Sequence, residues 1–231
     1  MIVFYIKSIV DKQAIIEDEE YVHCCKVLRN KVGDTIHITD GKGLSGTATI
    51  ESISKKSAAI SIQSTTQHTQ SPHQYTIAIA PPKNRSRWEW FVEKSVEIGV
   101  TKIIPLKTKN SERAKINIER SQKIIRSAAI QSLRHHHPLI SDTMTLDQLL
   151  EYGQSYDGRY TAHYKPEHKH LLDCQKDQLS SIIIIGPEGD FTENELQATV
   201  NHKFSAVNIS KNRLRTETAG IVAITQLVSK A

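Results

Sequence analysis

The chain has 231 residues, of which 38 % are hydrophobic and 24 % are charged, and its formal net charge is +5. This composition is typical of a globular protein with one large domain or two small ones. No apolar run approaches the roughly 20 residues that a membrane-spanning helix needs, and the apolar start lacks the features of a signal peptide. We therefore expect no association with a membrane.

The cysteines and histidines do not form a metal-binding pattern. Three cysteines without framework spacing argue against a disulfide scaffold and predict a cytoplasmic location. His23, Cys24 and Cys25 are consecutive, which suits a tetrahedral site poorly, and no CxxC partner is present. The run 135–137 consists of histidines and is interpreted as a solvated helix end or an RNA contact. We expect no metal site.

The first part of the chain predicts a small β-barrel. Short strands are expected over residues 2–6, 35–39, 45–53 and 58–63, with glycine turns between them and a helix over 18–28. The polar stretch 64–74 shows no periodicity, so the domain boundary is placed there. The predicted domains are residues 1–70 and 71–231.

From Tyr75 onward, strands and helices alternate. Strands are expected over 75–80, 102–105, 160–164, 181–185 and 206–209, and helices over 86–98, 117–134, 192–200 and 216–229. This order predicts an α/β fold, with a mostly parallel sheet covered by helices on both faces. In the first of these helices, one face carries Trp88, Phe91, Val92, Ser95 and Val96, which we expect in the core.

The positive charge is confined to the middle of the chain. Residues 81–134 hold 13 Lys and Arg against 5 Glu, whereas residues 1–70 are neutral and residues 135–231 carry a net −3. A local excess of basic residues is typical of a nucleic-acid partner. An ordinary solvated surface is the alternative.

Two loops near the C-terminus contain the candidate chemistry. Gly186-Pro187-Glu188-Gly189 follows an isoleucine-rich strand, and Leu214 to Ala219 leads into the last helix. In open α/β folds, ligands bind at the edge where such loops lie. Glycine permits close approach of the backbone and positive φ, although a simple turn would also use it. Neither GxxxxGK[ST] nor GxGxxG is present, which argues against a common nucleotide site.

The second loop also leaves alternatives open. Thr216 is a possible N-cap, and Arg215 is either a surface residue or a ligand for an anion or for uracil carbonyls.

Several segments together resemble the RsmE family, bacterial enzymes that methylate N3 of a uridine in 16S ribosomal RNA. The matching segments lie in the family's order along almost the whole chain. They are His23-Cys24-Cys25-Lys26-Val27-Leu28-Arg29 with Gly33-Asp34, Lys83-Asn84-Arg85, Glu97-Ile98-Gly99-Val100, Gln131-Ser132-Leu133-Arg134 with Pro138, Gly186-Pro187-Glu188-Gly189-Asp190-Phe191, and Leu214-Arg215-Thr216-Glu217-Thr218-Ala219.

The resemblance implies a SPOUT-class methyltransferase with a C-terminal trefoil knot and an N-terminal PUA-like barrel. It implies that the protein is a homodimer that binds S-adenosyl-L-methionine and acts on 16S ribosomal RNA or the small ribosomal subunit. The residues implied to bind the cofactor are Gly186, Pro187, Glu188, Gly189, Ile209, Ser210, Leu214 and Ala219. The residues expected to bind RNA are Lys26, Arg29, Lys83, Arg85 and Arg134.

Arg215 and Glu217 are the expected catalytic residues. Loss of the N3 proton places charge on the uracil carbonyl oxygens, which a fixed Arg215 would stabilise. Arginine remains protonated and is not the base. Glu217 is either the base, a residue that orients Arg215, or an acidic capping residue at the start of the helix. The alternatives to this function are a SPOUT enzyme with another target, such as a ribose 2′-hydroxyl, a non-catalytic RNA-binding protein, and an α/β enzyme acting on an acidic metabolite.

Two positions depart from the family pattern. Asp190 stands where the family has a second glycine, so this turn does not need positive φ unless aspartate tolerates it. Asn212 stands where many members have arginine, and Arg213 follows it. The sequence therefore leaves open whether Arg213 or Arg215 supports catalysis, and we favour Arg215.

Overall fold

The computed structural model of the protein describes residues 2–112, 116–174 and 178–229. The chain forms two compact units. The first consists of Met1–Gln70 together with Ala129–His137, and the second of Ser71–Ala128 together with Pro138–Ala231. Each unit is described separately below.

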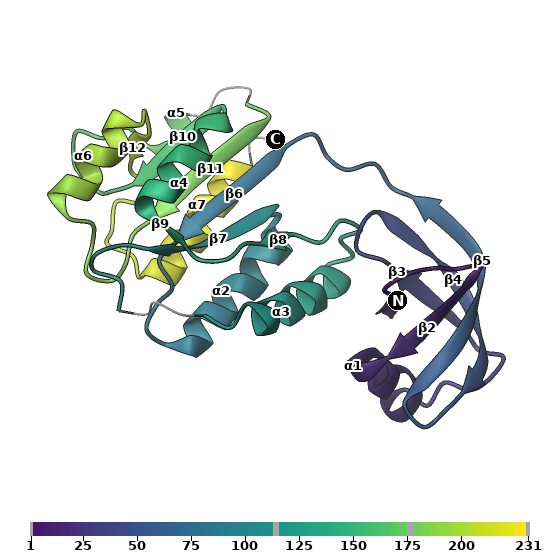
Figure 1. Ribbon diagram of the computed structural model, residues 1–231. Coiled ribbons are helices and arrows are strands. Elements are labelled where there is room, and N and C mark those ends of the chain that lie inside the picture. The colour runs from purple at the N-terminus through teal and green to yellow at the C-terminus, as the bar shows by residue number, and fades with distance from the viewer. Residues whose placement is uncertain (1, 113–115, 175–177, 230–231) are drawn as a thin grey trace. The chain divides into compact units, whose positions relative to one another are not determined.

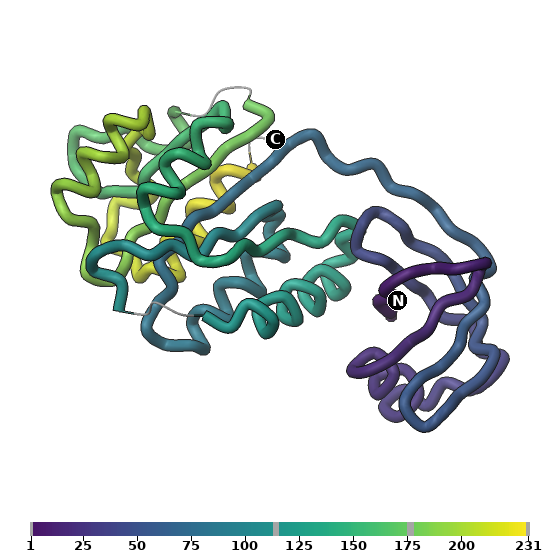
Figure 2. The backbone as a smooth tube through the Cα atoms, viewed as in Figure 1, coloured from purple at the N-terminus to yellow at the C-terminus, as the bar shows by residue number. Residues whose placement is uncertain are grey.

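The first unit is built on a curled five-stranded sheet. Its strands are β1 (Val3–Tyr5), β2 (Gln13–Glu17), β3 (Thr35–Thr39), β4 (Leu44–Ile53) and β5 (Ser57–Gln67), in the spatial order β1-β3-β4-β5-β2. β1 is parallel to β3, and the other neighbours are antiparallel. Figure 2 shows these strands, in purple and blue, curving around a common interior. The expected small barrel is thus a half-barrel, with β1 and β2 as its edges.

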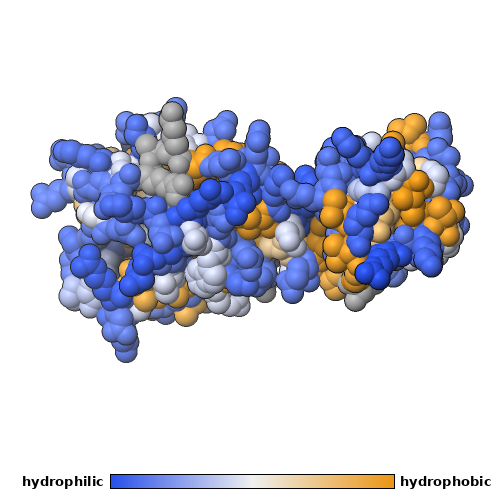
Figure 3. Space-filling model, turned by 90° about the horizontal axis from the view of Figure 1, so that it is seen from below, coloured by the Kyte–Doolittle hydropathy of each residue, from blue (hydrophilic) through white to orange (hydrophobic). Residues whose placement is uncertain are grey.

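Alternating side chains fill that interior. Ile36, Ile38, Ile50 and Ile60 are buried on one face of the sheet, as a period of two residues requires. Helix α1 (Asp18–Tyr21) continues into the π-helical turn η1 (Val22–Val27) and closes this core. Large apolar side chains also remain exposed on this unit, including Val10, Ile15 and Val27, and Figure 3 shows hydrophobic areas on its surface.

The candidate cysteine cluster is part of this core. Cys24 is fully buried, and its Sγ lies 3.4 Å from the donating Nδ2 of Asn30. Burial raises the pKa of the Cys24 thiol to about 11, so the thiol is protonated and unreactive at neutral pH. Within residues 2–112, 116–174 and 178–229, no three His, Cys, Asp or Glu side chains are close enough to hold a metal ion.

Residues 129–137 belong to the first unit, although the sequence places them in the predicted second domain, 71–231. The backbone N–H of Gly43 donates to the carbonyl of His135 at 2.9 Å, and that of His137 donates to Gly41 at 2.8 Å. Gly41 and Gly43 have positive φ, and a Cβ on either would lie within 3 Å of a histidine ring. These are long-range backbone contacts, which no local pattern predicts.

The second unit contains the predicted parallel sheet. Its strands are β6 (Gln74–Ile79), β7 (Lys102–Lys107), β8 (Leu139–Ile140), β10 (Gly158–Ala162), β11 (Ser180–Ile185) and β12 (Ser205–Val207), and β9 (Met144–Thr145) pairs with β7. The order is β12-β10-β11-β6-β7-β8, and all neighbours are parallel. Figure 1 shows helices on both faces of this sheet.

The helices of this unit are α2 (Arg85–Ile98), α3 (Ile118–Gln131), α4 (Leu146–Tyr152), α5 (Leu171–Cys174), α6 (Glu193–Asn201) and α7 (Thr216–Val228), with a 3-10 turn, η2, at Gly153–Ser155. α3 ends three residues before the predicted helix does, and its last residues belong to the first unit. Among the described residues, none of these helices has the length and apolar character needed to cross a membrane.

Both faces of β11 are buried. Ile182 and Ile184 pack in one cluster with Leu149 of α4 and Phe204, which follows α6. On the other face of the sheet, α2 and α7 pack so closely that a Cβ on Gly220 would lie 2.6 Å from the Phe91 ring and 2.9 Å from Ile79. Both faces of the central strands are therefore covered, and the carboxyl edge of the sheet remains open to a ligand.

The sequence predicted α2 better than the elements around it. The five expected core residues of α2 are all buried, and Gly99 ends the helix with φ 131°. In contrast, β5 extends to Gln67, into the stretch predicted as irregular, because pairing with β4 satisfies its polar backbone. α4 was not predicted. The trefoil knot stays a prediction.

Candidate functional site

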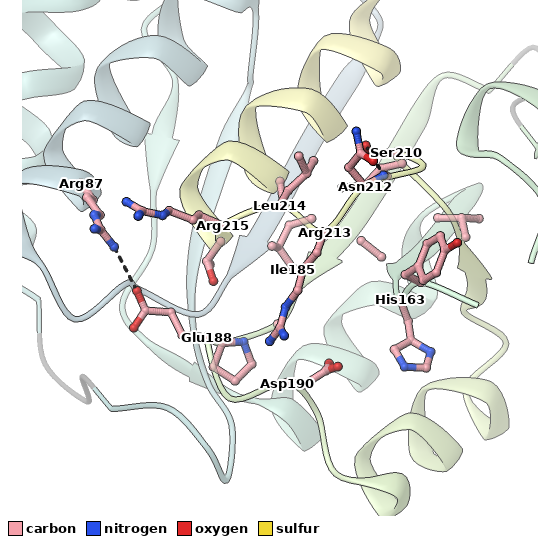
Figure 4. A pocket seen from close by; sticks show the side chains of 18 residues that line it. Arg87, His163, Ile185, Glu188, Asp190, Ser210, Asn212, Arg213, Leu214 and Arg215 are labelled. Carbon is pink, nitrogen blue, oxygen red and sulfur yellow. Dashed lines mark hydrogen bonds and ion pairs between the residues drawn. The ribbon is translucent and has the colours of Figure 1, made fainter. Parts of the chain in front are cut away.

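A cavity of about 380 Å³ lies at the carboxyl ends of β10, β11 and β12. Its volume falls within the range of small-molecule sites. Figure 4 shows its side chains projecting from α2, the strand ends and the start of α7. The lining residues that the sequence predicted are Gly186, Pro187, Glu188, Ile209, Ser210, Leu214, Arg215 and Ala219. Gly189 and Glu217 were also predicted as site residues, but they are not among the residues that line the cavity.

The loop after β11 is shaped by internal packing. A Cβ on Gly186 would lie 2.7 Å from the Phe191 ring, so the aromatic ring occupies the space beside this glycine. The residue with left-handed backbone is Asp190, at φ 61°, rather than either glycine. Its Oδ1 accepts a hydrogen bond from the N–H of Phe191 at 2.8 Å, which helps aspartate adopt this conformation. The family glycine is thus replaced by a residue that keeps the turn.

Gly189 supports the loop from outside the cavity. The side-chain Nδ2 of Asn110, which follows β7, donates to the carbonyls of Gly189 and Asp190 at 3.1 and 3.0 Å. A Cβ on Gly189 would lie 3.3 Å from the Cβ of Asn110. The sequence predicts that this glycine lets the backbone approach a ligand. In the structure, the close neighbour of Gly189 is Asn110 instead.

Arg215 precedes the first turn of α7 and is its N-cap residue. Its backbone is extended and its side chain makes no capping hydrogen bond, while Thr216 is already helical and buried. Thr216 is therefore not the N-cap. Within the described part of the chain, the Arg215 guanidinium has no ion pair or hydrogen bond, and Figure 4 shows its side chain extending toward Arg87 on one side of the cavity. It is available to an anionic or carbonyl-bearing ligand.

Glu217 is a buried carboxylate whose cationic partner is Arg87. Its side chain is 8 % exposed, and Oε1 lies 3.5 Å from Nε of Arg87. Oε2 has no hydrogen-bond partner among the described residues. Nη1 of Arg87 also lies 3.5 Å from Oε1 of Glu188. One side chain of α2 thus connects the loop after β11 to the start of α7.

Sequence reasoning missed Arg87. The residue lies in the basic stretch but carries no distinguishing motif, and its partners are far along the chain. The expected contact between Glu217 and Arg215 is not among the interactions of the described residues.

The loop after β12 forms the third wall. Nδ2 of Asn208 donates to the carbonyls of Lys165 and His168, each at 2.7 Å, so this loop is held against the segment that follows β10. Nε2 of Gln226 in α7 donates to the Ile209 carbonyl at 2.9 Å. Both Asn212 and Arg213 line the cavity, and Figure 4 shows the Arg213 side chain extending toward Asp190.

His163 also lines the cavity. Burial lowers the pKa of His163, which favours the neutral form of its ring.

The five predicted RNA-binding residues are divided between the units. Lys26, Arg29 and Arg134 lie in the first unit and Lys83 and Arg85 in the second. Lys26 and Arg29 are exposed, whereas Arg134 is half-buried. Lys83 pairs with Glu112 at 2.8 Å, and Arg85 pairs with Glu89 at 2.6 Å.

Glu89 is shared by two arginines. It accepts from Arg120 through both oxygens and from Arg85 through one. The Arg120 hydrogen bonds, with those of Arg85, lower the pKa of Glu89 to about 2. Part of the basic stretch is therefore neutralised within the protein, which a count of charges did not reveal.

Comparison with known proteins agrees with this architecture. Residues 69–228 match the RNA methyltransferase domain family, and residues 16–63 match the RNA methyltransferase PUA domain family. The chain is 31 % identical to the ribosomal RNA small subunit methyltransferase E of Rickettsia conorii, over 96 % of this chain and 93 % of that protein.

Solved structures extend the likeness to the whole fold. A probable rRNA-methyltransferase from Porphyromonas gingivalis has a TM-score of 0.90 at 33 % identity and covers 99 % of this chain and 98 % of its own. The ribosomal RNA small subunit methyltransferase E of Neisseria gonorrhoeae, bound to S-adenosyl methionine, has a TM-score of 0.86 at 29 % identity, covering 100 % of this chain and 98 % of its own. The chain belongs to the ribosomal RNA small subunit methyltransferase E family of RNA methyltransferases.

Proposed function

We propose that this protein transfers the methyl group of S-adenosyl-L-methionine to N3 of a uridine in 16S ribosomal RNA. The observation that carries the proposal is the cavity at the carboxyl edge of the sheet, which combines apolar side chains from the strand ends with Arg215, an arginine that has no ion pair or hydrogen bond among the described residues. The family membership supports the same reaction class.

The residues of the cavity fit the cofactor. Ile185, Val207, Ile209 and Leu214 offer apolar contacts to an adenine ring. Backbone groups of Gly186 to Glu188 and of Ile209 and Ser210 offer hydrogen bonds, and Ala219 leaves room near the start of α7. When bound, S-adenosyl-L-methionine supplies a methyl group on a positively charged sulfur.

Arg215 is proposed as the catalytic residue. The uracil N3–H must lose its proton to solvent before N3 attacks, and the resulting charge spreads to the two flanking carbonyl oxygens. The Arg215 guanidinium would donate hydrogen bonds to that developing charge. Because its side chain is not held by another described residue, this arginine is free to turn toward a bound uracil.

Glu217 is proposed as a positioning residue rather than as the base. It is buried, lies outside the cavity lining and contacts Arg87. Through Arg87 it ties the start of α7, and hence Arg215, to Glu188 in the opposite wall. The distance between these walls determines where the uracil sits relative to the cofactor.

The RNA would present an unpaired uridine. N3 lies on the Watson–Crick edge, so a paired uridine must be extruded before reaction. Lys26, Arg29, Lys83, Arg85 and Arg134 are proposed to contact the phosphate backbone. We also propose that the protein acts as a homodimer in the cytoplasm, as the resemblance to the family implies, and light scattering of the purified protein tests the dimer.

The decisive test is mapping of the methylated nucleotide. Small subunits from cells that lack this protein are incubated with purified enzyme and S-adenosyl-L-methionine, and the 16S RNA is digested and analysed by mass spectrometry. We expect one new 3-methyluridine. A methyl group on a ribose 2′-oxygen or on another base would contradict the proposed target, and an absence of transfer despite RNA binding would indicate a non-catalytic protein.

A further inference from the structure

We propose that the first unit contains a second recognition site, which binds an unpaired nucleobase of the RNA substrate other than the methylated one. The site is a cavity of about 360 Å³ on the face of the half-barrel opposite its core. Every residue that lines it belongs to the first unit. The inference rests on the proposed function only in taking RNA as the substrate.

The sheet contributes aligned rows of small polar side chains to the floor. Across β1, β3, β4 and β5, Val3 pairs with His37, His37 with Thr47, and Thr47 with Ser64. Two residues further along, the neighbouring row includes Thr39, Ser45 and Thr66. Because side chains alternate along a strand, both rows point to the same face. The hydroxyls of Thr47 and Ser64 bond to each other, that of Ser45 bonds to His68, and that of Thr39 donates to the Leu44 carbonyl. Each hydroxyl has one donor and two acceptor lone pairs, so these groups keep acceptor capacity for the donors of a base edge, and Thr66 can also donate.

Segment 129–137 supplies an aromatic surface to the same cavity. His135 lines the cavity and stacks on His68, with ring centroids 3.5 Å apart and planes 5° apart. His68 is held in turn by Ser45 Oγ at 2.8 Å from its Nε2, and its carbonyl lies 2.9 Å from Nε2 of His136. The ring of His135 is therefore fixed before any ligand arrives, which lowers the entropy lost on stacking.

Apolar side chains complete the walls. Ile130 and Leu133 line the cavity, and Leu133 is 50 % exposed. Its backbone is in the left-handed region at φ 54°, a conformation that costs energy for leucine. An exposed apolar side chain beside an anchored aromatic ring matches the way single-stranded RNA is bound, with bases stacked against rings and apolar groups.

The chemistry of the lining favours a base over a charged ligand or a peptide. No Asp, Glu, Lys or Arg is among the residues that line this cavity, so the part of the ligand inside it is neutral. Of the strands that line the cavity, β1 is the edge strand, and its contribution to the lining is Val3 alone, which gives an added peptide strand little backbone to pair with here. A neutral ring with hydrogen-bonding edges meets these conditions. The PUA match spans most of β3, β4 and β5 and associates this unit with RNA methyltransferases.

The test compares two oligoribonucleotides of equal charge, a hexauridylate and an abasic ribose-phosphate hexamer, binding to the full-length protein. His135→Ala removes the stacking surface, and His135→Phe keeps it. Thr66→Val removes one hydroxyl of the floor, and its matched control is Thr65→Val, on the opposite face of the same strand. Fluorescence anisotropy gives each affinity, and thermal melts confirm that each variant is folded.

We expect His135→Ala to weaken hexauridylate binding about tenfold, within the usual range for loss of one stacked base. His135→Phe should stay within about threefold of the wild-type affinity, because the ring is retained. Thr66→Val should weaken binding, and Thr65→Val should not. None of the four changes should alter binding of the abasic hexamer.

Equal losses for both oligomers would show backbone contacts and overturn the proposal. Unchanged hexauridylate binding in both His135→Ala and Thr66→Val would overturn it as well, and would point to a protein segment as the occupant. The assay contains no cofactor and measures no methyl transfer. The binding assay can therefore contradict the proposed base site without contradicting the methyltransferase activity, and loss of the activity would not contradict the base site.

Discussion

Nε of Arg87 lies 3.5 Å from Oε1 of Glu217, and this contact joins α2 to the first turn of α7. The carboxylate is buried and the guanidinium is about one-third exposed. The same guanidinium reaches Glu188 on the other side of the cavity. Two loops that the sequence singled out separately are therefore held by a residue that it did not identify.

Removing this cation should destabilise the protein through the carboxylate that remains. We expect Arg87→Gln to lower the free energy of unfolding by about 1–3 kcal/mol, the usual cost of a buried polar group left without a partner. Arg87→Gln combined with Glu217→Gln should recover most of this loss, because no buried charge remains. Urea unfolding of both variants measures the difference. Glu217→Gln alone completes the cycle, and a double variant destabilised by as much as the sum of the two single changes, or by more, would contradict the pairing.

Arg215→Ala should separate catalysis from cofactor binding. We expect kcat to fall about 10²–10³-fold, as for loss of one group that stabilises developing charge. Affinity for S-adenosyl-L-methionine, measured by calorimetry, should change little. Arg213→Ala is the matched control, since Arg213 lines the same cavity. If Arg213→Ala has the larger effect on kcat, the catalytic arginine is Arg213.

The lowered pKa of Glu89 predicts that the stability of the protein depends on pH. Its pKa is lowered to about 2 in the folded protein by Arg120 and Arg85, whereas an unfolded glutamate titrates near 4.3. A lowered folded-state pKa stabilises the protein above the unfolded pKa, and the contribution is lost as the pH falls from about 4.3 toward about 2. Because the two arginines are about half exposed, solvent screening reduces the contribution to about 1 kcal/mol.

Glu89→Gln should therefore have a lower free energy of unfolding than the wild type at pH 7. This difference in free energy should become smaller as the pH falls below about 4. Glu93→Gln, in the same helix, is the control, since Glu93 pairs only with the neighbouring Lys94 among the described residues. Unfolding experiments at pH 7, 4 and 2.5 provide the comparison. A difference that persists unchanged at pH 2.5 would exclude the ion-pair explanation.

Asp190 should be replaceable by glycine more readily than by alanine. Its φ of 61° lies in the left-handed region, where a Cβ costs roughly 1 kcal/mol and glycine has no such cost. We expect Asp190→Gly to melt above Asp190→Ala, although both lose the hydrogen bond to the Phe191 N–H. Calorimetric melting of the two variants tests the order. The reverse order would mean that backbone strain is not what distinguishes this position.

Gly186 and Gly189 should respond differently to alanine. At Gly186 the new Cβ would meet the Phe191 ring at 2.7 Å, whereas at Gly189 the nearest atom is 3.3 Å away. Displacement of Phe191 would shift the wall that contains Pro187 and Glu188, so Gly186→Ala should weaken cofactor binding more than Gly189→Ala. Calorimetry with S-adenosyl-L-methionine tests this, and equal affinities would show that the loop adjusts freely.

Local patterns determined a large part of this protein. The apolar stripe of α2, the alternation of strands and helices, and the glycine and proline turn after β11 each depend on residues close together in the sequence. The chain's own periodicity therefore predicts them. The ordered motifs also indicated the family, and most of the residues chosen for the cofactor line one cavity. That placement supports their assignment, which still awaits the binding experiments above.

Tertiary structure decided what depends on distant contacts. Arg87 and Glu188 are 101 positions apart, and residues 129–137 join the first unit through hydrogen bonds to Gly41 and Gly43. Neither contact leaves a periodic signal, because each involves one or two residues meeting across the fold. The left-handed turn at Asp190 is similar, since the hydrogen bonds from Phe191 and Asn110 hold a conformation that residue type alone does not require. The sequence therefore indicated which segments line the cavity, and only the folded chain determined which side chains hold those segments in place.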